Sequence, residues 1–366
     1  MFDLAPNVVT ALGGLLIGIV VGATIQLTNF CTMGGISDYV LLGNGNRLRA
    51  WVLATATAII GTQLLAWQGL IDLSKSIYLT PNFGWLGAIL GGALFGFGMT
   101  KASGCASRNL ARIGSGNLKA IIVILVMGVV AYMTLRGLLG PLRLQLETTN
   151  IKLEDKGMNS QLIGDILAGL AGTAPELMRA VVRIALPLAL LVWCFKDSEF
   201  RSSPRNMIAG FIIGACIIAG WVITGILGAD EFAPIPPASL TFVAPSADAL
   251  QYLMTWTGAS INFGIAVVGG VILGAFLAAI AAGRFYLEGF ADADDTLRHI
   301  SGAALMGFGG VLALGCTIGQ GATGMSTLAA GSLIAWISII AGGYFGIKHL
   351  EEGSLAGALR ASFSRS

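Results

Sequence analysis

The sequence predicts an all-α polytopic membrane protein with about nine transmembrane helices, re-entrant loops and an inverted internal repeat. Mean hydropathy is +0.81, and only 11% of the 366 residues are charged. Soluble domains carry charge on about a quarter of their residues, so this chain must keep most of its surface in lipid. The third observation, a duplicated Gly-Cys segment, predicts the repeat.

Nine stretches without charged residues occur along the chain, and each is a candidate membrane-spanning segment. Crossing a bilayer core as a helix takes about 20 apolar residues. Several stretches approach that length, and the shorter ones predict tilted, broken or re-entrant pieces. The stretches cover residues 8–27, 51–68, 84–100, 120–135, 184–195, 207–228, 261–283, 300–316 and 331–347.

The amino terminus lacks the basic region and cleavage site of a signal peptide, so residues 8–27 are expected to be a retained span. We therefore expect residues 1–366 to form a single integral membrane domain. Residues 351–366 would be a cytoplasmic tail.

Basic residues give the predicted orientation. They cluster at Arg47 and Arg49 and within 196–205, 284–298 and 348–365. By the positive-inside rule these clusters face the cytoplasm.

The connection 229–260 has no Lys or Arg and is predicted to face outward. The amino terminus then lies outside and the carboxyl terminus inside. Continuity of the crossings puts the mixed-charge segment 136–156 outside, against the rule.

Residues 93–105 recur 211 positions later. Both segments have the lead-in "GALFGFG" or "AALMGFG" and end in Gly-Cys, with eight identities in thirteen positions. In the predicted orientation, the helix ending at Cys105 enters from outside and the helix ending at Cys316 enters from inside. Opposite topology of two copies is the inverted repeat of many transporters. Its approximate limits are 1–160 and 161–350.

Stretches that make poor helix follow both cysteines, "ASRNLARIGSGN" at 106–117 and "TIGQGATGMST" at 317–327. Non-helical backbone at membrane depth is tolerated only where it is buried in protein or lines a polar cavity. The pattern therefore predicts two re-entrant loops that meet near the membrane centre, each presenting one thiol. We expect a thiol reagent applied outside to reach Cys105 before Cys316.

A third cysteine, Cys31, lies among similar glycines and polar residues in "NFCTMGGISD". By contrast, Cys194 and Cys216 lie in ordinary apolar segments, where a cysteine is usually a small buried hydrophobe. The candidate thiols are therefore Cys31, Cys105 and Cys316.

The segments "FCTMGGISD", "GFGMTKASGCASRNLARIGSGNLKA" and "GFGGVLALGCTIGQGATGMSTLAAGSL" resemble the three cysteine-bearing signatures of the YeeE/YedE sulphur-transport family of bacterial inner-membrane proteins. The resemblance implies thiosulfate uptake through an hourglass-shaped bundle, with Cys31, Cys105 and Cys316 lining the path. It also implies a TusA-like sulfurtransferase as a cytoplasmic partner. Some relatives are associated with selenium, which leaves a selenium compound or another sulphur anion as alternative substrates.

The chemistry of the predicted loops suits an anion. Moving a divalent anion into an apolar waist costs on the order of tens of kcal/mol unless its hydration shell is replaced. Backbone N–H groups of loops containing Gly104 and Gly315 can replace it. Asn109 and Gln320, four residues past each cysteine, are candidate donors to substrate oxygens.

Thiols have an unperturbed pKa of about 8.5, so the candidate cysteines are expected to act as neutral, soft donors. Three basic residues are further candidates. Lys101 replaces Leu312 of the second copy, and an intramembrane Lys is a functional candidate by default. Arg108 and Arg112 can steer an anion.

Two other function classes remain open. A membrane thiol–disulfide oxidoreductase would be expected to show a C-x-x-C pair, and a soft-metal transporter would be expected to show clustered Cys, Met or His. The chain has neither pattern, and the acidic stretch 287–299 lacks ligand spacing. We therefore expect no enzyme activity, no cofactor and no metal. A net charge of +2 suggests no nucleic-acid partner.

Overall fold

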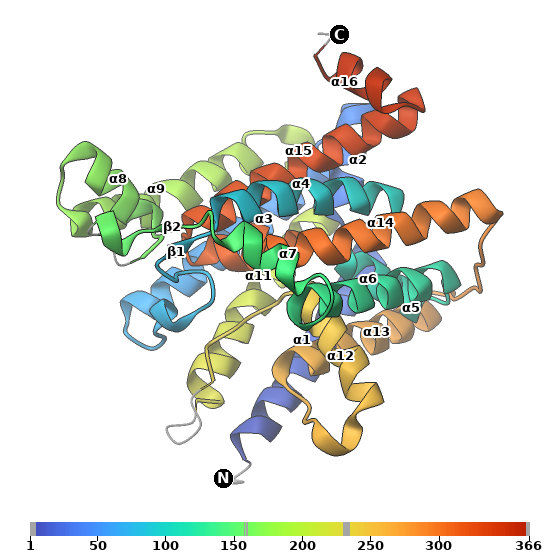
Figure 1. Cartoon of the computed structure of the whole chain (residues 1–366), viewed down its shortest axis with the longest axis horizontal. Coiled ribbons are helices and arrows are strands. Elements are labelled where there is room, and N and C mark those ends of the chain that lie inside the picture. Colours follow the sequence, from blue (N-terminus) through green and yellow to red (C-terminus); the bar gives the residue numbers. More distant parts are fainter. Residues whose placement is uncertain (1–4, 157, 159, 230–234, 364–366) are drawn as a thin grey trace.

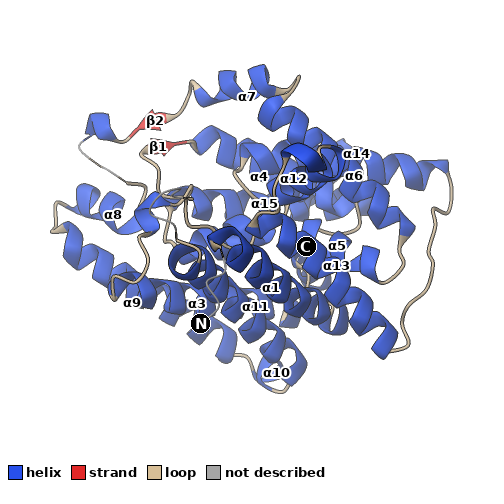
Figure 2. Cartoon of the chain, turned by 90° about the horizontal axis from the view of Figure 1, so that it is seen from below, coloured by secondary structure: helices blue, strands red, loops and turns tan. Residues whose placement is uncertain are grey.

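The computed structural model describes residues 5–156, 158, 160–229 and 235–363. Within these residues the molecule is a bundle of helices, and its sheet structure is one antiparallel pair of two-residue strands (Figures 1 and 2). The elements up to residue 156 are α1 (Pro6–Thr28), α2 (Thr32–Leu42), α3 (Asn46–Trp67), η1 (Leu73–Lys75), β1 (Asn82–Phe83), α4 (Trp85–Lys101), α5 (Ala106–Gly114), α6 (Leu118–Arg136), α7 (Gly140–Glu147), β2 (Ile151–Lys152) and η2 (Glu154–Lys156). The later elements are α8 (Ile163–Ala171), α9 (Pro175–Phe195), α10 (Ser198–Arg201), α11 (Pro204–Val222), η3 (Ile223–Leu227), α12 (Val243–Met254), η4 (Trp256–Gly258), α13 (Phe263–Ala281), α14 (Ala293–Leu312), η5 (Gly319–Gly324), α15 (Ala330–Glu352) and α16 (Leu355–Phe363).

The prediction of a polytopic all-α membrane protein is confirmed. Each of the nine charge-free stretches coincides with a helix or with most of one. Seven helical segments of the described chain are long and apolar enough to cross a membrane. The helices α4 and α14 fall outside that set, because α4 has 17 residues and α14 begins with charged residues. The count of nine crossings stays a prediction.

The two copies of the duplicated segment cross in opposite directions. Helices α4 and α14 are antiparallel, and four glycines form the crossing. Gly98 lies against Gly302, and Gly91 lies against Gly309, each pair backbone to backbone. Adding 211 to 91 and to 98 gives 302 and 309, so the contacts are related by a local two-fold axis. Small residues allow this close approach between helices in a membrane.

Other helix pairs also join the two halves of the chain. Helices α1 and α13 run parallel, with Gly14 beside Phe263 and Gly22 beside Val271. Helices α3 and α11 are also parallel, with Gly210 beside the Ala50 carbonyl. Because helices of each half pack mainly on those of the other, the halves interlock. The limits 1–160 and 161–350 stay a prediction.

The bundle has two end faces. The amino-terminal face contains the β1–β2 pair and the bridge between Leu162 and Ala329. The carboxy-terminal face contains the bridge between Asn117 and Glu288 and the loops around α10. In Figure 1 the start of α1 lies at the bottom and the strands lie at the left, whereas α16 lies at the top and the α13–α14 connection lies at the right.

The predicted basic clusters share the carboxy-terminal face. Arg49 pairs with Asp197 at 3.0 Å, and Lys119 pairs with Asp295 at 3.0 Å and with Glu288 at 3.4 Å. These contacts agree with the relative sidedness expected from the sequence, while the assignment of this face to the cytoplasm stays a prediction. The segment 351–366, expected to be a tail, contains helix α16 as far as residue 363.

The connection 229–260 differs from the expectation that it simply faces outward. Residues 230–234 lie outside the described part. Beyond them the chain returns into the protein, where Ser239, Leu240 and Phe242 are buried, and it leaves again as α12. The absence of basic residues could not reveal this, because buried and external segments both lack them.

Candidate functional site

The two predicted loops begin with the same backbone break. Ser103 and Leu314 both have φ 56°, and Gly104 and Gly315 both have φ 159°. Cys105 and Cys316 follow these glycines. The break after α4 is therefore repeated, residue for residue, after α14.

The prediction that 106–117 and 317–327 are non-helical was wrong. Residues 106–114 form α5, and residues 317–326 are helical, with the wide turn η5 at Gly319–Gly324. The chain breaks within 102–105 and 313–316, and again at 115–117 and 327–329, where these helical segments end. Ala, Leu and Arg after Cys105 favour helix once the break has been made, and the glycine-rich second segment forms its wide turn beside Trp51 and Trp336.

Each candidate thiol lies at the start of a short helix. Cys31 precedes α2, directly after Asn29 has ended α1 in a left-handed conformation. Cys105 precedes α5, and Cys316 precedes the helical segment 317–326. The N–H of Gly319 donates to Cys316 Sγ at 3.3 Å. The free N–H groups and the dipole of a helix make its amino terminus favourable for an anion.

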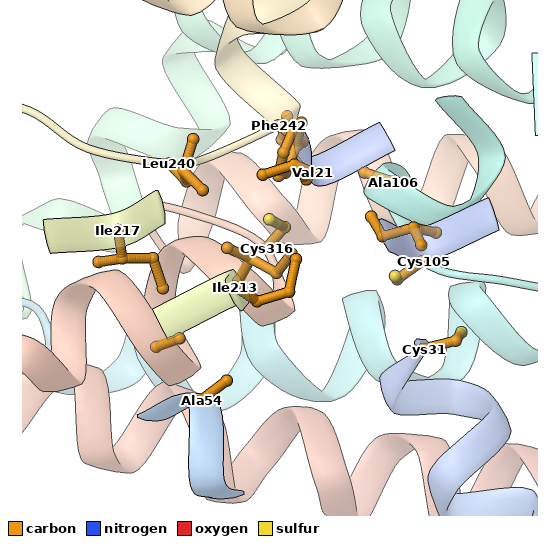
Figure 3. Packing of buried hydrophobic residues seen from close by; sticks show 14 of the residues in the cluster. Val21, Cys31, Ala54, Cys105, Ala106, Ile213, Ile217, Leu240, Phe242 and Cys316 are labelled. Carbon is orange, nitrogen blue, oxygen red and sulfur yellow. The ribbon is translucent and has the colours of Figure 1, made fainter. Parts of the chain in front are cut away.

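The three thiols are buried, and they divide into two groups. Cys31 and Cys105 are in direct contact with each other. Cys316 lies apart from them, beside Thr241 and the backbone of Phe242. Figure 3 shows the same division, with Phe242 next to Cys316. All five cysteines are free.

The two breaks begin at opposite ends of the antiparallel helix pair. Gly87, near the start of α4, lies against Leu312, near the end of α14, so the break before Cys316 begins on the amino-terminal side. The break before Cys105 begins at the other end, because the 17 residues of α4 span about 25 Å. In the predicted orientation, a reagent outside the cell approaches from the side of Cys316, which reverses the order expected from the sequence; the order itself stays a prediction.

Two of the three predicted basic residues donate hydrogen bonds to backbone and side-chain groups around the first break, at 102–105, and at the end of α1. Arg108 donates from Nη1 to the Ile25 carbonyl at 3.0 Å and from Nη2 to Asn29 Oδ1 at 2.8 Å. Arg112 donates to the Ser103 carbonyl at 2.9 Å. Lys101 has neither a hydrogen bond nor an ion pair among the described residues. In the part of the chain that the structure describes, no carboxylate pairs with any of the three.

Asn109 and Gln320 also contact the breaks. Asn109 Nδ2 donates to the carbonyls of Gly104 at 2.9 Å and Cys105 at 3.2 Å. Gln320 Nε2 donates to the Ala313 carbonyl at 2.5 Å. These amides therefore stabilise the loop conformation, and their contact with a substrate stays a prediction.

Buried polar atoms without a partner lie next to the thiols. The hydroxyls of Thr32 and Thr317 and the Oε1 atom of Gln320 have no hydrogen-bond partner among the described residues. An unpaired buried polar group is costly and points to a ligand or water. Sequence reasoning missed both threonines, although the dipeptide Cys-Thr at 31–32 and 316–317 was a visible signal.

A cavity of about 730 Å³, here called the vestibule, opens on the amino-terminal face. Thr327, at the end of the helical segment that begins after Cys316, contributes to its lining. Arg183 lies in the vestibule and donates to Gln63 Oε1 at 3.3 Å, and Gln63 Nε2 donates to the Ser326 carbonyl at 2.8 Å. Nothing in the sequence around Arg183 indicates a site, because this residue directly precedes the charge-free stretch 184–195 and looks like the charged flank of a span.

Within the described residues, no group of three or more His, Cys, Asp or Glu side chains could hold a metal ion. The arrangement instead offers thiols, hydroxyls and helix amino termini. These groups suit a soft anion better than a cation.

Comparison with known proteins agrees with this chemistry. The profile of the family described as "Sulphur transport" matches residues 27–345. The thiosulfate transporter TsuA of Escherichia coli is 28% identical over 315 residues, which cover 85% of this chain and 86% of that protein. The thiosulfate transporter TsuA of Spirochaeta thermophila is 28% identical over 341 residues, covering 90% of this chain and 96% of that protein.

Proposed function

The chain belongs to the sulphur transport family, and we propose that it takes up thiosulfate through a path lined by Cys31, Cys105 and Cys316. The observation that carries the proposal is the position of the three buried thiols. Each thiol directly precedes a short helix. Cys105 and Cys316 do so at the breaks in the duplicated segments, and Cys31 does so just after the end of α1. Relatives named as thiosulfate transporters support the substrate.

The helix amino termini offset the loss of hydration. A dianion inside the bundle must replace water with other donors, and N–H groups at the starts of α2, α5 and the segment 317–326 can supply them. The unpaired hydroxyls of Thr32 and Thr317 add two further donors. Because these contacts are spread over two groups, no single site needs to bind the ion tightly, which favours conduction.

Neutral thiols complete the recognition of a sulphur anion. A thiolate would repel the substrate, whereas S–H is a weak donor that can face the terminal sulphur of thiosulfate. The vestibule supports an entrance on the amino-terminal face, because its lining includes the end of the segment that begins after Cys316. The ion would then meet Cys316 first and the Cys105–Cys31 pair second.

Uptake of radiolabelled thiosulfate into proteoliposomes tests the function. We expect Cys105→Ala and Cys316→Ala to abolish uptake without unfolding the protein. The matched controls are Cys194→Ala and Cys216→Ala, which remove buried thiols outside the proposed path and should leave uptake nearly unchanged. Wild-type uptake in both path variants would refute the cysteine-lined path.

The same assay ranks the alternatives. Stronger uptake of selenite or another sulphur anion would reassign the substrate within this class. Copper uptake would favour a soft-metal transporter, and a redox-active disulfide in a thiol titration would favour an oxidoreductase.

We place the carboxy-terminal face in the cytoplasm of a bacterial inner membrane, on the basis of its basic clusters. A charged, membrane-impermeant thiol reagent applied to intact cells should then modify Cys316 faster than Cys105. A TusA-like sulfurtransferase would accept the product on the cytoplasmic side. Enclosing such a protein in the liposomes should increase net uptake.

A further inference from the structure

The two-fold relation of the bundle leaves one thiol position without a thiol. The offset of 211 residues that relates Cys105 to Cys316 also relates Cys31 to Phe242. Both residues directly precede short helices, α2 and α12. Cys31 contacts Cys105, and the backbone of Phe242 contacts Cys316. Phe242 therefore stands where a fourth cysteine would complete the symmetry.

Phe242 lies inside the bundle. Its side chain is fully buried, as is that of Leu240, two residues before it. Figure 3 shows Phe242 beside Cys316, with Cys105 and Cys31 farther away. The Cys316 group is also the one nearer the vestibule. An ion that enters from the amino-terminal face thus reaches one thiol and one aromatic ring before it reaches two thiols.

We propose that Phe242 determines the specificity of the path by excluding strongly hydrated anions from the Cys316 group; this inference rests on the proposed function. The side chain of Phe carries no N–H or O–H group. An ion that contacts it must therefore lose water molecules on that side without gaining hydrogen bonds in their place. Thiosulfate can present its weakly hydrated terminal sulphur to the ring and to Cys316. Sulfate has only oxygen atoms and cannot.

Substitution of Phe242 tests the proposal in proteoliposomes that contain either thiosulfate or sulfate as the labelled ion. Phe242→Ala and Phe242→Cys should lower the ratio of thiosulfate to sulfate uptake by about tenfold, which is in the range for altered contacts in an apolar pocket. Phe242→Leu is the matched control, because it keeps an apolar side chain of intermediate size. It should retain most of the wild-type ratio.

Labelling provides a measurement that does not depend on transport. In Phe242→Ala, a charged thiol reagent added on the amino-terminal side should modify Cys316 about tenfold faster than in the wild type. The rate at Cys105 relative to Cys316 should fall accordingly. If the alanine variant does not fold, the cysteine variant, with labelling sites identified by mass spectrometry, replaces it.

Two results would overturn the proposal. One is an unchanged uptake ratio in folded Phe242→Cys, and the other is an unchanged labelling rate at Cys316. Either result would leave the proposed function intact if Cys105→Ala still abolished uptake. Failure of the wild type to carry thiosulfate would instead refute the proposed function, while the labelling rates would still report on the ring.

Discussion

The crossing of α4 and α14 predicts that two substitutions far apart in sequence have the same effect. A Cβ atom added at Gly98 would lie 2.6 Å from the Gly302 carbonyl oxygen and 2.9 Å from the Met306 nitrogen. A Cβ atom added at Gly309 would lie 2.6 Å from the Gly91 carbonyl oxygen. These neighbours are backbone atoms, so no side chain can rotate away. The helices must separate by roughly 0.8 Å to restore ordinary contact at about 3.4 Å.

The expected magnitude follows from two opposing effects. Overpacking a close contact costs about 1–3 kcal/mol, whereas replacing Gly by Ala inside a helix gains about 0.5–1 kcal/mol. We therefore expect Gly98→Ala and Gly309→Ala each to lower the free energy of unfolding by about 1–2 kcal/mol. The double variant should lose less than the sum, because the first substitution has already separated the helices.

Denaturant unfolding of the purified protein in detergent measures these changes. The matched control is Gly269→Ala in α13, where an added Cβ would meet nothing within 4 Å; it should be neutral or slightly stabilising. Uptake should fall with stability in the two crossing variants, since separation displaces both breaks that carry thiols. Crossing variants as stable as the control would refute the close packing, and a large effect at only one of the two glycines would refute the two-fold relation.

Three further predictions concern charge and thiol chemistry. Lys119 holds the pKa of Asp295, in the first charged turn of α14, well below its usual range, so the ion pair stabilises the fold fully above pH about 4 and loses this effect as the pH falls further. Asp295→Asn should thus lower the free energy of unfolding by about 1–3 kcal/mol at pH 7, and the difference from wild type should shrink below pH 4 in unfolding experiments. Arg183→Gln should raise the thiosulfate concentration for half-maximal uptake, most clearly at low ionic strength, whereas Arg179→Gln should not, because Arg179 is already paired. Cys316→Ser should keep partial uptake, since a hydroxyl also donates, and equal loss in Cys316→Ser and Cys316→Ala would count against donation.

Sequence patterns revealed the fold class because hydrophobic length is a local property. The charge-free stretches coincide with helices, and the shared Gly-Phe-Gly and Gly-Cys positions predicted the opposed pair α4 and α14. The same locality explains the errors. Residues 106–114 look like poor helix when read alone, yet they form α5 once the break at 102–105 has turned the chain.

Hydrophobic length and shared motif positions could not predict which residues of the two halves contact each other. Nothing in the sequence near Cys31 reveals that its partner is Cys105, because that contact depends on where α1 ends relative to α4. The order in which a reagent reaches Cys105 and Cys316 also depends on where each helix breaks, because a charge pattern gives the side from which a helix enters but not how far it reaches. Arg183 was missed because only the fold brings it to the lining of the vestibule.

The departures from symmetry between the two halves bear on what the path can and cannot do. When the halves are aligned, Lys101 corresponds to Leu312 and Cys31 corresponds to Phe242, so an ion in the proposed path would meet different groups from the two sides. Such differences change affinity and rate, but they cannot make a passive path one-directional, because forward and reverse fluxes through the same groups must balance when the electrochemical potential of the ion is equal on both sides. Net uptake therefore requires a gradient, a coupled ion or removal of thiosulfate on the inner side. Removal by a sulfurtransferase would supply the direction that three thiols and one aromatic ring cannot, and the comparison of liposomes with and without that enclosed protein measures its share directly.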